Sequence, residues 1–367
     1  MYLESQSTSS KQNWVEQFTV LFWDDFIKFD DVTLPVGQCS VDLLNIEQAQ
    51  LRELRRAYVA FAEFFSRTIG SQGVKKDLAL VTAVQDKMNE VWDAAFALPP
   101  FFRMKLDKEY SKSILLTLFR RDPRGFARIE NSLSHEGMLM TELLLKLQRL
   151  HSDALSFTTY ISTLSDFFYE RLKKRDAYHF SVGIYSLLSD TALMNEIAAA
   201  LPSHPDLAFK LKSETSIEFT PMRDPTNEKN YVVAERLVFE SLGDFLRADF
   251  FRGVARGNAP RRCHNCGKFF LLTRGYDVRY CTEVAPSETE RTCRMVGAHK
   301  KEMRREGKTP AQKEYYKVYN RLKTRKSRGK ISDDDWNRGV ALAQDLRDKA
   351  DRGELSEFEL KRRFDEM

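Results

Sequence analysis

The sequence predicts a mainly α protein, with a helical N-terminal body that contains a short β-hairpin, then a small four-cysteine module and a helical tail. Apolar residues recur at steps of three and four over long stretches, which is typical of helices that bury one face. With 42% hydrophobic residues and 26 phenylalanines, a chain of 367 residues can bury more than one core. We expect three parts: the body over residues 1–257, the module with a basic helix over 258–308, and a basic helical tail over 309–367.

Long helices are expected in the body. Their predicted bounds are residues 46–70, 77–98 and 138–174. In the first, apolar residues lie three and four apart from Leu51 to Phe65. Pro99 and Pro100 end the second, because proline cannot continue a helix. Residues 1–46 show no clear period, so irregular structure with one short helix is expected there.

A change of pattern after residue 212 predicts the β-hairpin. Residues 216–220 alternate between apolar and polar, and residues 231–233 include two β-branched valines, so both strands are expected within residues 213–236. A helix is then expected over residues 234–255. The tail contains residues of the kind that cap helix N-termini. These expected caps are Thr309, Ser332 and Ser356.

Four of the five cysteines lie within 31 residues, which in a long chain indicates a metal site rather than a disulfide framework. Cys263 and Cys266 form a Cys-x-x-Cys pair, and Gly267 permits a tight backbone turn under a metal. Cys281 and Cys293 complete a set of four thiolates, which leaves no open coordination position. The sequence therefore predicts one structural Zn²⁺ in a zinc-ribbon or treble-clef-like module, where such an ion contributes about 10–16 kcal/mol to folding.

The rest of the module is expected to present the third and fourth cysteines. Phe269–Leu272 and Val278–Tyr280 are expected to pair as a hairpin whose far strand leads to Cys281. Cys293 is expected to open a basic helix that runs to about Arg305, where the helix dipole stabilises a thiolate.

The cysteine region also carries a family resemblance. The segments concerned are Cys-x-x-Cys-Gly-Lys-Phe-Phe at 263–270, Arg-Tyr-Cys at 279–281, and Cys293 leading into the basic residues 300–305. This pattern resembles the CGNR-type zinc finger of bacterial proteins regarded as transcription regulators. It is still more similar to an uncharacterised family of bacterial and mobile-element proteins that share the Arg-Thr-Cys-Arg context at 291–294 and the helical tail.

The resemblance covers roughly residues 232–365. It implies a zinc ion held by the four cysteines and a DNA-binding role as a regulator or a mobile-element accessory factor. Two differences from the CGNR type are visible. Residues 293–296 read Cys-Arg-Met-Val in place of Cys-Gly-Asn-Arg, and residues 282–292 form a longer insert.

The charge of the chain is unevenly distributed. Residues 251–330 hold 22 Lys and Arg against 7 Asp and Glu, a net charge of +15, while the whole chain carries +5. The remaining residues therefore carry −10, and such a basic block beside an acidic body is typical of a surface that binds DNA or RNA. The predicted nucleic-acid contacts are Arg261, Arg262, Lys268, Arg274, Arg279, Arg294, Lys300, Lys301, Arg304 and Arg305.

Two other functions remain open. The first is a nuclease-like enzyme, but the sequence contains no Walker loop, His-Glu-x-x-His or Gly-x-Ser-x-Gly motif, and we assign no catalytic residue. The acidic pairs Asp24–Asp25 and Asp30–Asp31 are candidate Mg²⁺ ligands, although such pairs are more often surface charges. The second is an adaptor, in which the acidic body binds a protein partner or a second copy and zinc only stabilises the tail.

The sequence also predicts where the protein resides. The most apolar stretch, residues 181–201, is interrupted by Asp190 and Glu196, so no membrane span is expected. Residues 1–17 contain Glu4 and Glu16 and lack the basic and apolar regions of a signal peptide. We therefore expect a cytoplasmic protein.

Overall fold

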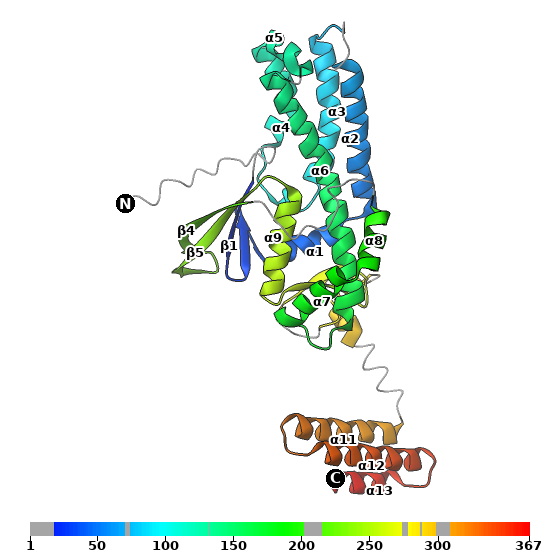
Figure 1. Ribbon diagram of the computed structural model, residues 1–367. Helices are drawn as coiled ribbons and strands as arrows, with labels where there is room; N and C mark the ends of the chain where they lie inside the picture. Colours follow the sequence, from blue (N-terminus) through cyan, green and yellow to red (C-terminus); the bar gives the residue numbers. More distant parts are fainter. Residues whose placement is uncertain are drawn as a thin grey trace. The chain divides into compact units, whose positions relative to one another are not determined.

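The computed structural model describes residues 18–69, 74–131, 133–201, 215–273, 278–286, 288–298 and 309–367. By its internal contacts the chain divides into two units, an N-terminal unit (Met1–Cys281) and a C-terminal unit (Thr282–Met367). Helices dominate each unit, which confirms the predicted mainly α fold (Figure 1). In the described part of the chain, no helix is both long and apolar enough to cross a lipid bilayer. The predicted boundaries after residues 257 and 308 stay predictions.

The N-terminal unit contains a five-stranded antiparallel sheet. Its strands, in their order across the sheet, are β3 (Val32–Pro35), β2 (Phe26–Phe29), β1 (Phe18–Trp23), β5 (Asn227–Phe239) and β4 (Ser216–Asp224). β1 and β5 pair so that Phe18 lies opposite Phe239, which joins segments more than 200 residues apart in the sequence. The β4–β5 hairpin lies in the region where the sequence predicts one.

Helices form the rest of the N-terminal unit. They are α1 (Gln38–Leu44), α2 (Gln48–Thr68), α3 (Leu78–Phe96), α4 (Lys108–Arg121), α5 (Pro123–Phe126), α6 (His135–Thr163), α7 (Ala177–Ser189), α8 (Thr191–Ala200) and α9 (Leu242–Ala255). Short 3₁₀ turns lie at η1 (Phe101–Arg103), η2 (Ala127–Glu130) and η4 (Tyr169–Arg171). α2, α3, α4 and α6 run alongside one another, while α1 and α9 lie near the sheet (Figure 1).

Two expectations for the five-stranded sheet and its surroundings are wrong. Residues 18–46 form three strands and α1 rather than irregular structure with one helix, because the strands are short and turn tightly at Asp24 and Asp30 in left-handed conformations with φ of 43° and 51°. The helix expected from residue 234 begins only at Leu242, because residues 234–239 continue β5 beside β1.

Aromatic side chains join the sheet to α9. The ring of Phe18 lies 5.7 Å from that of Phe239 and 5.5 Å from that of Phe245, and all three side chains are buried. Such edge and tilted contacts add to the hydrophobic stabilisation of a core. This cluster fixes α9 against the sheet, and the metal-binding segment follows directly from the end of α9.

A buried carboxylate ties α9 to the start of α1. Oδ1 of Asp249 accepts the N–H of Gly37 at 2.7 Å, and Oδ2 accepts the N–H and the hydroxyl of Ser40 at 2.8 and 2.7 Å. Gly37 has a φ of 95°, which favours glycine. Burial raises the pKa of Asp249 to about 6, although the hydrogen bonds from Gly37 and Ser40 act in the opposite direction. A second carboxylate, that of the half-buried Asp153, accepts the N–H of Gly243, and desolvation raises its pKa to about 6 as well.

The end of α6 changes its winding. After Thr163 the chain forms η3, a π-helical turn over Leu164–Phe168, and then the 3₁₀ turn η4. The sequence predicts a plain helix to residue 174, so this change is a correction. π-helical turns redirect side chains and are frequent at functional sites. Here the turn carries Ser165 and Asp166, both of which bind the cysteine-containing segment.

The described tail of the C-terminal unit contains three helices, α11 (Pro310–Ser327), α12 (Asp333–Asp351) and α13 (Glu357–Asp365). Their apolar faces form one core, which includes Tyr315, Leu322, Leu346 and Phe364. All three expected caps are confirmed. The N–H of Gln312 donates to Thr309 Oγ1 at 3.1 Å, the N–H of Asp335 to Ser332 Oγ at 3.1 Å, and the N–H of Glu359 to Ser356 Oγ at 3.2 Å.

We predict that Asp249→Asn lowers the free energy of unfolding by about 1–3 kcal/mol, because the new amide places an N–H group against a backbone N–H donor. Urea unfolding followed by circular dichroism measures the change. Asp86→Asn, at an exposed position of α3, is the matched control and leaves stability within about 0.5 kcal/mol. Equal stability of the two variants would contradict the role of Asp249.

The pKa values of Asp249 and Asp153 also predict a pH dependence. An unfolded aspartate titrates near 3.9, whereas both groups titrate at about 6 in the folded chain. Their contribution to stability is therefore fully present below about pH 4 and is lost as the pH rises through about 6. We expect the unfolding free energy of the wild type to fall more steeply over this range than that of Asp249→Asn, as urea titrations at each pH measure. Parallel profiles would contradict the assignment.

Candidate metal centre

The first two cysteines lie in the turn of a small hairpin. β6 (Ala259–Arg262) pairs with β7 (Phe269–Leu272), so the Cys-x-x-Cys segment occupies the connection between the two strands. The N–H of Cys263 donates to the carbonyl of Lys268 at 2.8 Å, and the N–H of Gly267 donates to the carbonyl of Cys263 at 2.9 Å. Gly267 has a φ of 76°, the left-handed conformation that glycine adopts without strain. The turn is therefore set by backbone bonds and one glycine.

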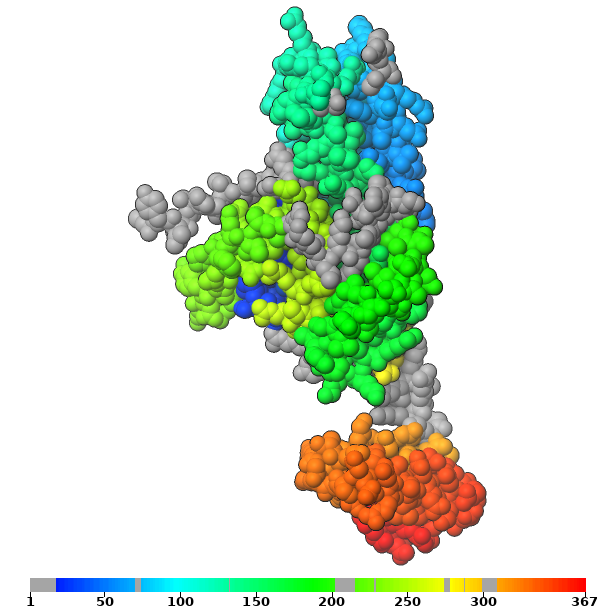
Figure 2. Space-filling model, viewed as in Figure 1, coloured from blue at the N-terminus to red at the C-terminus, as the bar shows by residue number. Residues whose placement is uncertain are grey.

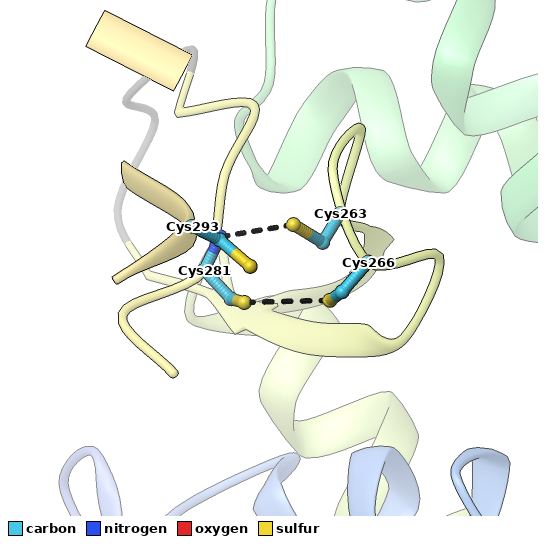
Figure 3. Close-up of side chains that lie close together, drawn as sticks. All are labelled: Cys263, Cys266, Cys281 and Cys293. Carbon is cyan, nitrogen blue, oxygen red and sulfur yellow. Dashed lines mark hydrogen bonds between the residues drawn. The ribbon is translucent and has the colours of Figure 1, made fainter. Parts of the chain in front are cut away.

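The four predicted cysteines lie together (Figure 3). The sulfur atoms of Cys263, Cys266, Cys281 and Cys293 all lie within 4.8 Å of one another, and those of Cys266 and Cys281 are 3.7 Å apart. A tetrahedral ion with metal–sulfur bonds of about 2.3 Å places its sulfur ligands roughly 3.8 Å apart. The sulfur positions are compatible with one four-coordinate metal ion.

Backbone N–H groups surround the Cys263 sulfur. The N–H of Cys281 and that of Asn265 point at this sulfur, at 3.4 and 3.5 Å. Burial alone raises the pKa of the Cys263 thiol, but the backbone N–H groups of Cys266, Cys281 and Asn265 outweigh it and lower the pKa to about 7. A lowered thiol pKa favours the thiolate, which is the form that binds metals.

A backbone pairing across the insert brings the fourth cysteine to the others. The N–H of Cys293 donates to the carbonyl of Glu283 at 2.8 Å, and Val284 bridges to Thr292. Residues 283 and 293 are therefore adjacent in space, so the long insert does not separate Cys293 from Cys281. Residues 293–298 are helical, as expected for a helix that opens at Cys293.

The hairpin expected between Phe269–Leu272 and Val278–Tyr280 is wrong. β7 pairs instead with β6, the strand before the first cysteine, and residues 278–280 are not in a strand. A side-chain amide from another segment binds the backbone of β7. Asn45, at the end of α1, accepts the N–H of Phe269 at 2.7 Å and donates to its carbonyl at 2.8 Å.

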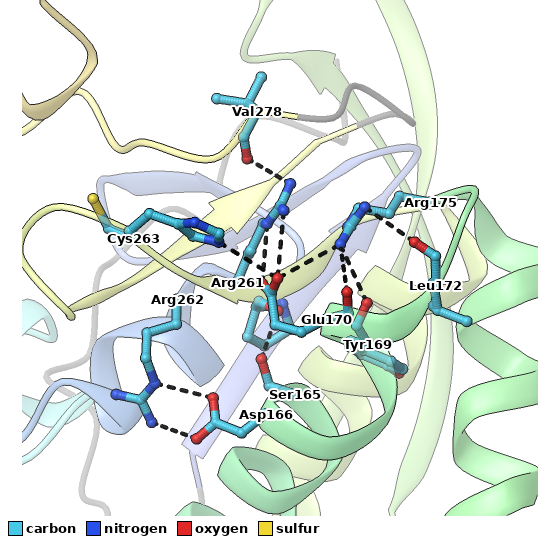
Figure 4. Close-up of polar contacts among 12 residues, drawn as sticks. Ser165, Asp166, Tyr169, Glu170, Leu172, Arg175, Arg261, Arg262, Cys263 and Val278 are labelled. Atoms are coloured by element: carbon cyan, nitrogen blue, oxygen red, sulfur yellow. Dashed lines mark hydrogen bonds and ion pairs between the residues drawn. The ribbon is translucent and has the colours of Figure 1, made fainter. Parts of the chain in front are cut away.

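Arg261 binds the metal-binding segment to the helical body (Figure 4). Its side chain is 4% exposed, and its Nε donates to the carboxylate of Glu170 at 3.1 Å. One terminal nitrogen also donates to the carbonyl of Val278 at 2.8 Å. His264 Nε2 lies 3.5 Å from the same carboxylate. Glu170 thus contacts residues on either side of Cys263.

A second ion pair lies beside the first. The guanidinium of Arg262 donates through two nitrogens to Asp166, at 3.0 and 2.7 Å, and a third nitrogen donates to the carbonyl of Gly267 (Figure 4). The same guanidinium lies 4.2 Å from the centre of the Phe269 ring. Bidentate pairs of this kind fix geometry as well as charge. Neither Asp166 nor Glu170 forms part of a local motif, so the sequence alone does not mark them as functional residues.

The predicted nucleic-acid contacts separate into groups. Arg261 is buried in the pair with Glu170, and Arg262 is half-buried against Asp166. Lys268, Arg279 and Arg294 are exposed. The remaining predicted contacts lie outside the described residues. These are Arg274, Lys300, Lys301, Arg304 and Arg305.

One of the two acidic pairs considered as Mg²⁺ ligands, Asp30–Asp31, contacts a lysine instead. Asp24–Asp25 and Asp30–Asp31 lie in the turns between β1, β2 and β3. The carboxylate of Asp30 accepts the N–H of Lys105, and Asp31 forms an ion pair with the ammonium group of the same lysine. Asp30 and Asp31 therefore connect the β2–β3 turn to the segment after α3.

Comparison with known proteins identifies one family. Residues 210–365, which are less than half of the 367-residue chain, match a family of unknown function (DUF6076). The match includes β4, β5, the four cysteines and the tail helices, and it overlaps the region over which an uncharacterised family is expected. It does not name the CGNR type or any other zinc finger. Neither the curated proteins nor the solved structures include a significant match to the chain.

We predict that the purified protein holds one metal ion per chain and that Cys281→Ser loses it, because a thiolate ligand is removed from a closed set of four. Elemental analysis by mass spectrometry measures the metal content. Cys39→Ser changes a buried cysteine of α1 that lies outside the cluster, and it keeps the metal. Protein prepared without chelator that contains no metal would contradict the site.

Proposed function

We propose that the protein binds nucleic acid through a zinc-stabilised module, as a regulator or an accessory factor of a mobile element. The observation that carries the proposal is the exposure of Lys268, Arg279 and Arg294 on the segments that hold the four cysteines. Because each of these cations is within three residues of a cysteine, a bound metal would fix the backbone from which they project. Cations on a fixed backbone lose less conformational entropy when they bind phosphate.

Zinc is the metal that this donor set suits best. Four thiolates are soft ligands, and a tetrahedral set of sulfur atoms is typical of Zn²⁺ or of an iron–sulfur centre. Structural zinc sites are closed by four protein ligands, and the four cysteines can supply all of them. We therefore assign the ion a structural role, with no open position for a substrate or a water molecule.

The charge of the segment favours a polyanion as the partner. Residues 251–330 carry 22 cationic against 7 anionic side chains. Arg261 and Arg262 are engaged by Glu170 and Asp166, so we leave them out of the proposed binding surface. Lys300, Lys301, Arg304 and Arg305, which follow the fourth cysteine along the chain, stay predicted contacts. Contacts of this kind give affinity for phosphates without reading the sequence of the bases.

We predict that changing Lys268 and Arg294 together to Gln weakens binding to duplex DNA. The logarithmic slope of affinity against salt decreases by about 0.9 for each lost phosphate contact, so by up to roughly 1.8 for the pair. Fluorescence anisotropy with a labelled duplex at four salt concentrations measures the slope. Zinc content, measured on the same samples, remains unchanged because neither residue is a ligand.

The control removes an equal charge from another surface. Arg120 and Arg121, exposed at the end of α4, are changed together to Gln. The control variant keeps the wild-type salt slope if the module is the binding surface. A wild-type protein that carries zinc and binds neither DNA nor RNA at low salt would overturn the proposed function and leave the adaptor hypothesis.

A further inference from the structure

A basic loop of the helical body lies next to the metal-binding segment. Glu170, which pairs with Arg261, is followed directly by Arg171 and then by the connection to α7. Arg171, Lys173 and Lys174 are all exposed. This connection therefore presents three exposed cations directly after the glutamate that pairs with Arg261.

The backbone of this loop is held by Arg175. The guanidinium of Arg175 is 8% exposed and donates to three carbonyl groups, those of Leu172 at 3.2 Å, Glu170 at 3.3 Å and Tyr169 at 3.4 Å (Figure 4). It also lies 3.7 Å from the Glu170 carboxylate. One buried cation thus fixes the chain from which the three exposed cations project. The loop is arranged before any ligand binds.

An aromatic stripe continues from the basic loop along α7. Tyr178 and Tyr185 are 72% and 73% exposed, and Val182 between them is 42% exposed. The opposite face of the helix, with Phe180 and Leu187, is buried. The spacing of four and three residues places the stripe on one side of the helix, with the two tyrosines about 10 Å apart along the axis. α7 and α8 form part of the visible surface of the N-terminal unit (Figure 2).

The acidic groups on either side of the loop are already engaged, Glu170 by Arg261 and Asp176 at the start of α7. Asp176 caps α7, since its Oδ1 accepts the N–H of His179 at 2.9 Å, and its second contact is with the imidazole of the same residue. These hydrogen bonds lower the pKa of Asp176 below its usual value. The carboxylate is therefore directed at the start of the helix, while the lysines and tyrosines remain exposed.

We propose that the basic loop (Arg171, Lys173 and Lys174) and the α7 stripe (Tyr178, Val182 and Tyr185) bind single-stranded nucleic acid. The cations contact the phosphates, and the two tyrosines stack on bases. Stacking of this kind requires bases that are not already stacked in a duplex, so it selects single strands. The inference rests on the proposed function, because it extends the nucleic-acid surface of the metal module onto the helical body.

The stripe is tested with Tyr178→Ala and Tyr185→Ala. Each variant is expected to bind a single-stranded 15-mer about tenfold more weakly, because one stacking contact is lost, while affinity for the matching duplex changes less than twofold. Fluorescence anisotropy is measured with single-stranded DNA, with RNA of the same sequence and with the duplex. Tyr110→Ala, at an exposed position of α4, is the matched control and leaves all three affinities unchanged.

The loop is tested by changing Arg171, Lys173 and Lys174 together to Gln. The salt slope for a single strand decreases by about 0.7 for each phosphate contact, so by up to roughly 2.1 for the three. The control changes three exposed cations at the α4–α5 end of the same unit, Arg120, Arg121 and Arg124, to Gln. An equal decrease in both variants would overturn the proposal, because the effect would then come from net charge alone.

The outcomes separate this inference from the proposed function. If the wild type binds none of the three nucleic acids, the proposed function itself fails. If the wild type binds and both tyrosine variants keep its affinity for single strands, only the single-strand site is overturned. Light scattering supplies a further check. Tyrosine variants that convert a dimer into monomers without a change in binding would identify the stripe as a contact between copies, which also overturns the proposal.

Discussion

The ion pair between the buried Arg261 and the half-buried Glu170 is the interaction on which the arrangement of the metal-binding segment depends. Removing the charge of Arg261 from water is costly, and the cost is offset only when its donors are satisfied. Arg261 meets this condition by binding Glu170 and the carbonyl of Val278. Loss of one partner would leave a buried charge without its counterion, which costs about 3–5 kcal/mol. The pair therefore fixes the position of β6 relative to the end of α6.

Through this ion pair and its neighbours, the first half of the metal-binding module packs against the helical body. β6 follows α9 after a short turn at Gly257. The side-chain amide of Asn45, at the end of α1, forms two hydrogen bonds with the backbone of β7. Asp166, on the π-helical turn, accepts hydrogen bonds from the guanidinium of Arg262. Cys263 and Cys266 thus belong to a surface that α1, α6 and α9 all support. A separate finger on a flexible linker would not show these contacts.

Local sequence patterns predict the features that depend only on residues close together in the chain. The spacing of the four cysteines predicts their cluster, and Thr309, Ser332 and Ser356 each cap the helix expected after them. Local signals do not mark β1, because its partner β5 lies more than 200 residues later in the chain, and β2 and β3 are only four residues long. The partner of β7 was missed for a related reason, since β6 has no strand-like alternation that marks it.

The composition of the basic segment does not show which of its cations pair with carboxylates and which are exposed. Arg261 and Arg262 belong to the most basic part of the chain, yet their carboxylate partners lie more than 90 residues earlier, on turns that no motif marks. The acidic residues of the body are therefore partly committed to holding the basic segment in place. The proposed ligand contacts are therefore a smaller set of exposed cations. One group lies near the cysteines, and the other lies in the basic loop, whose backbone is held by Arg175. Because fixed cations reach phosphates at a lower entropic cost, the proposed binding depends on how these few side chains are held rather than on the net charge of the segment.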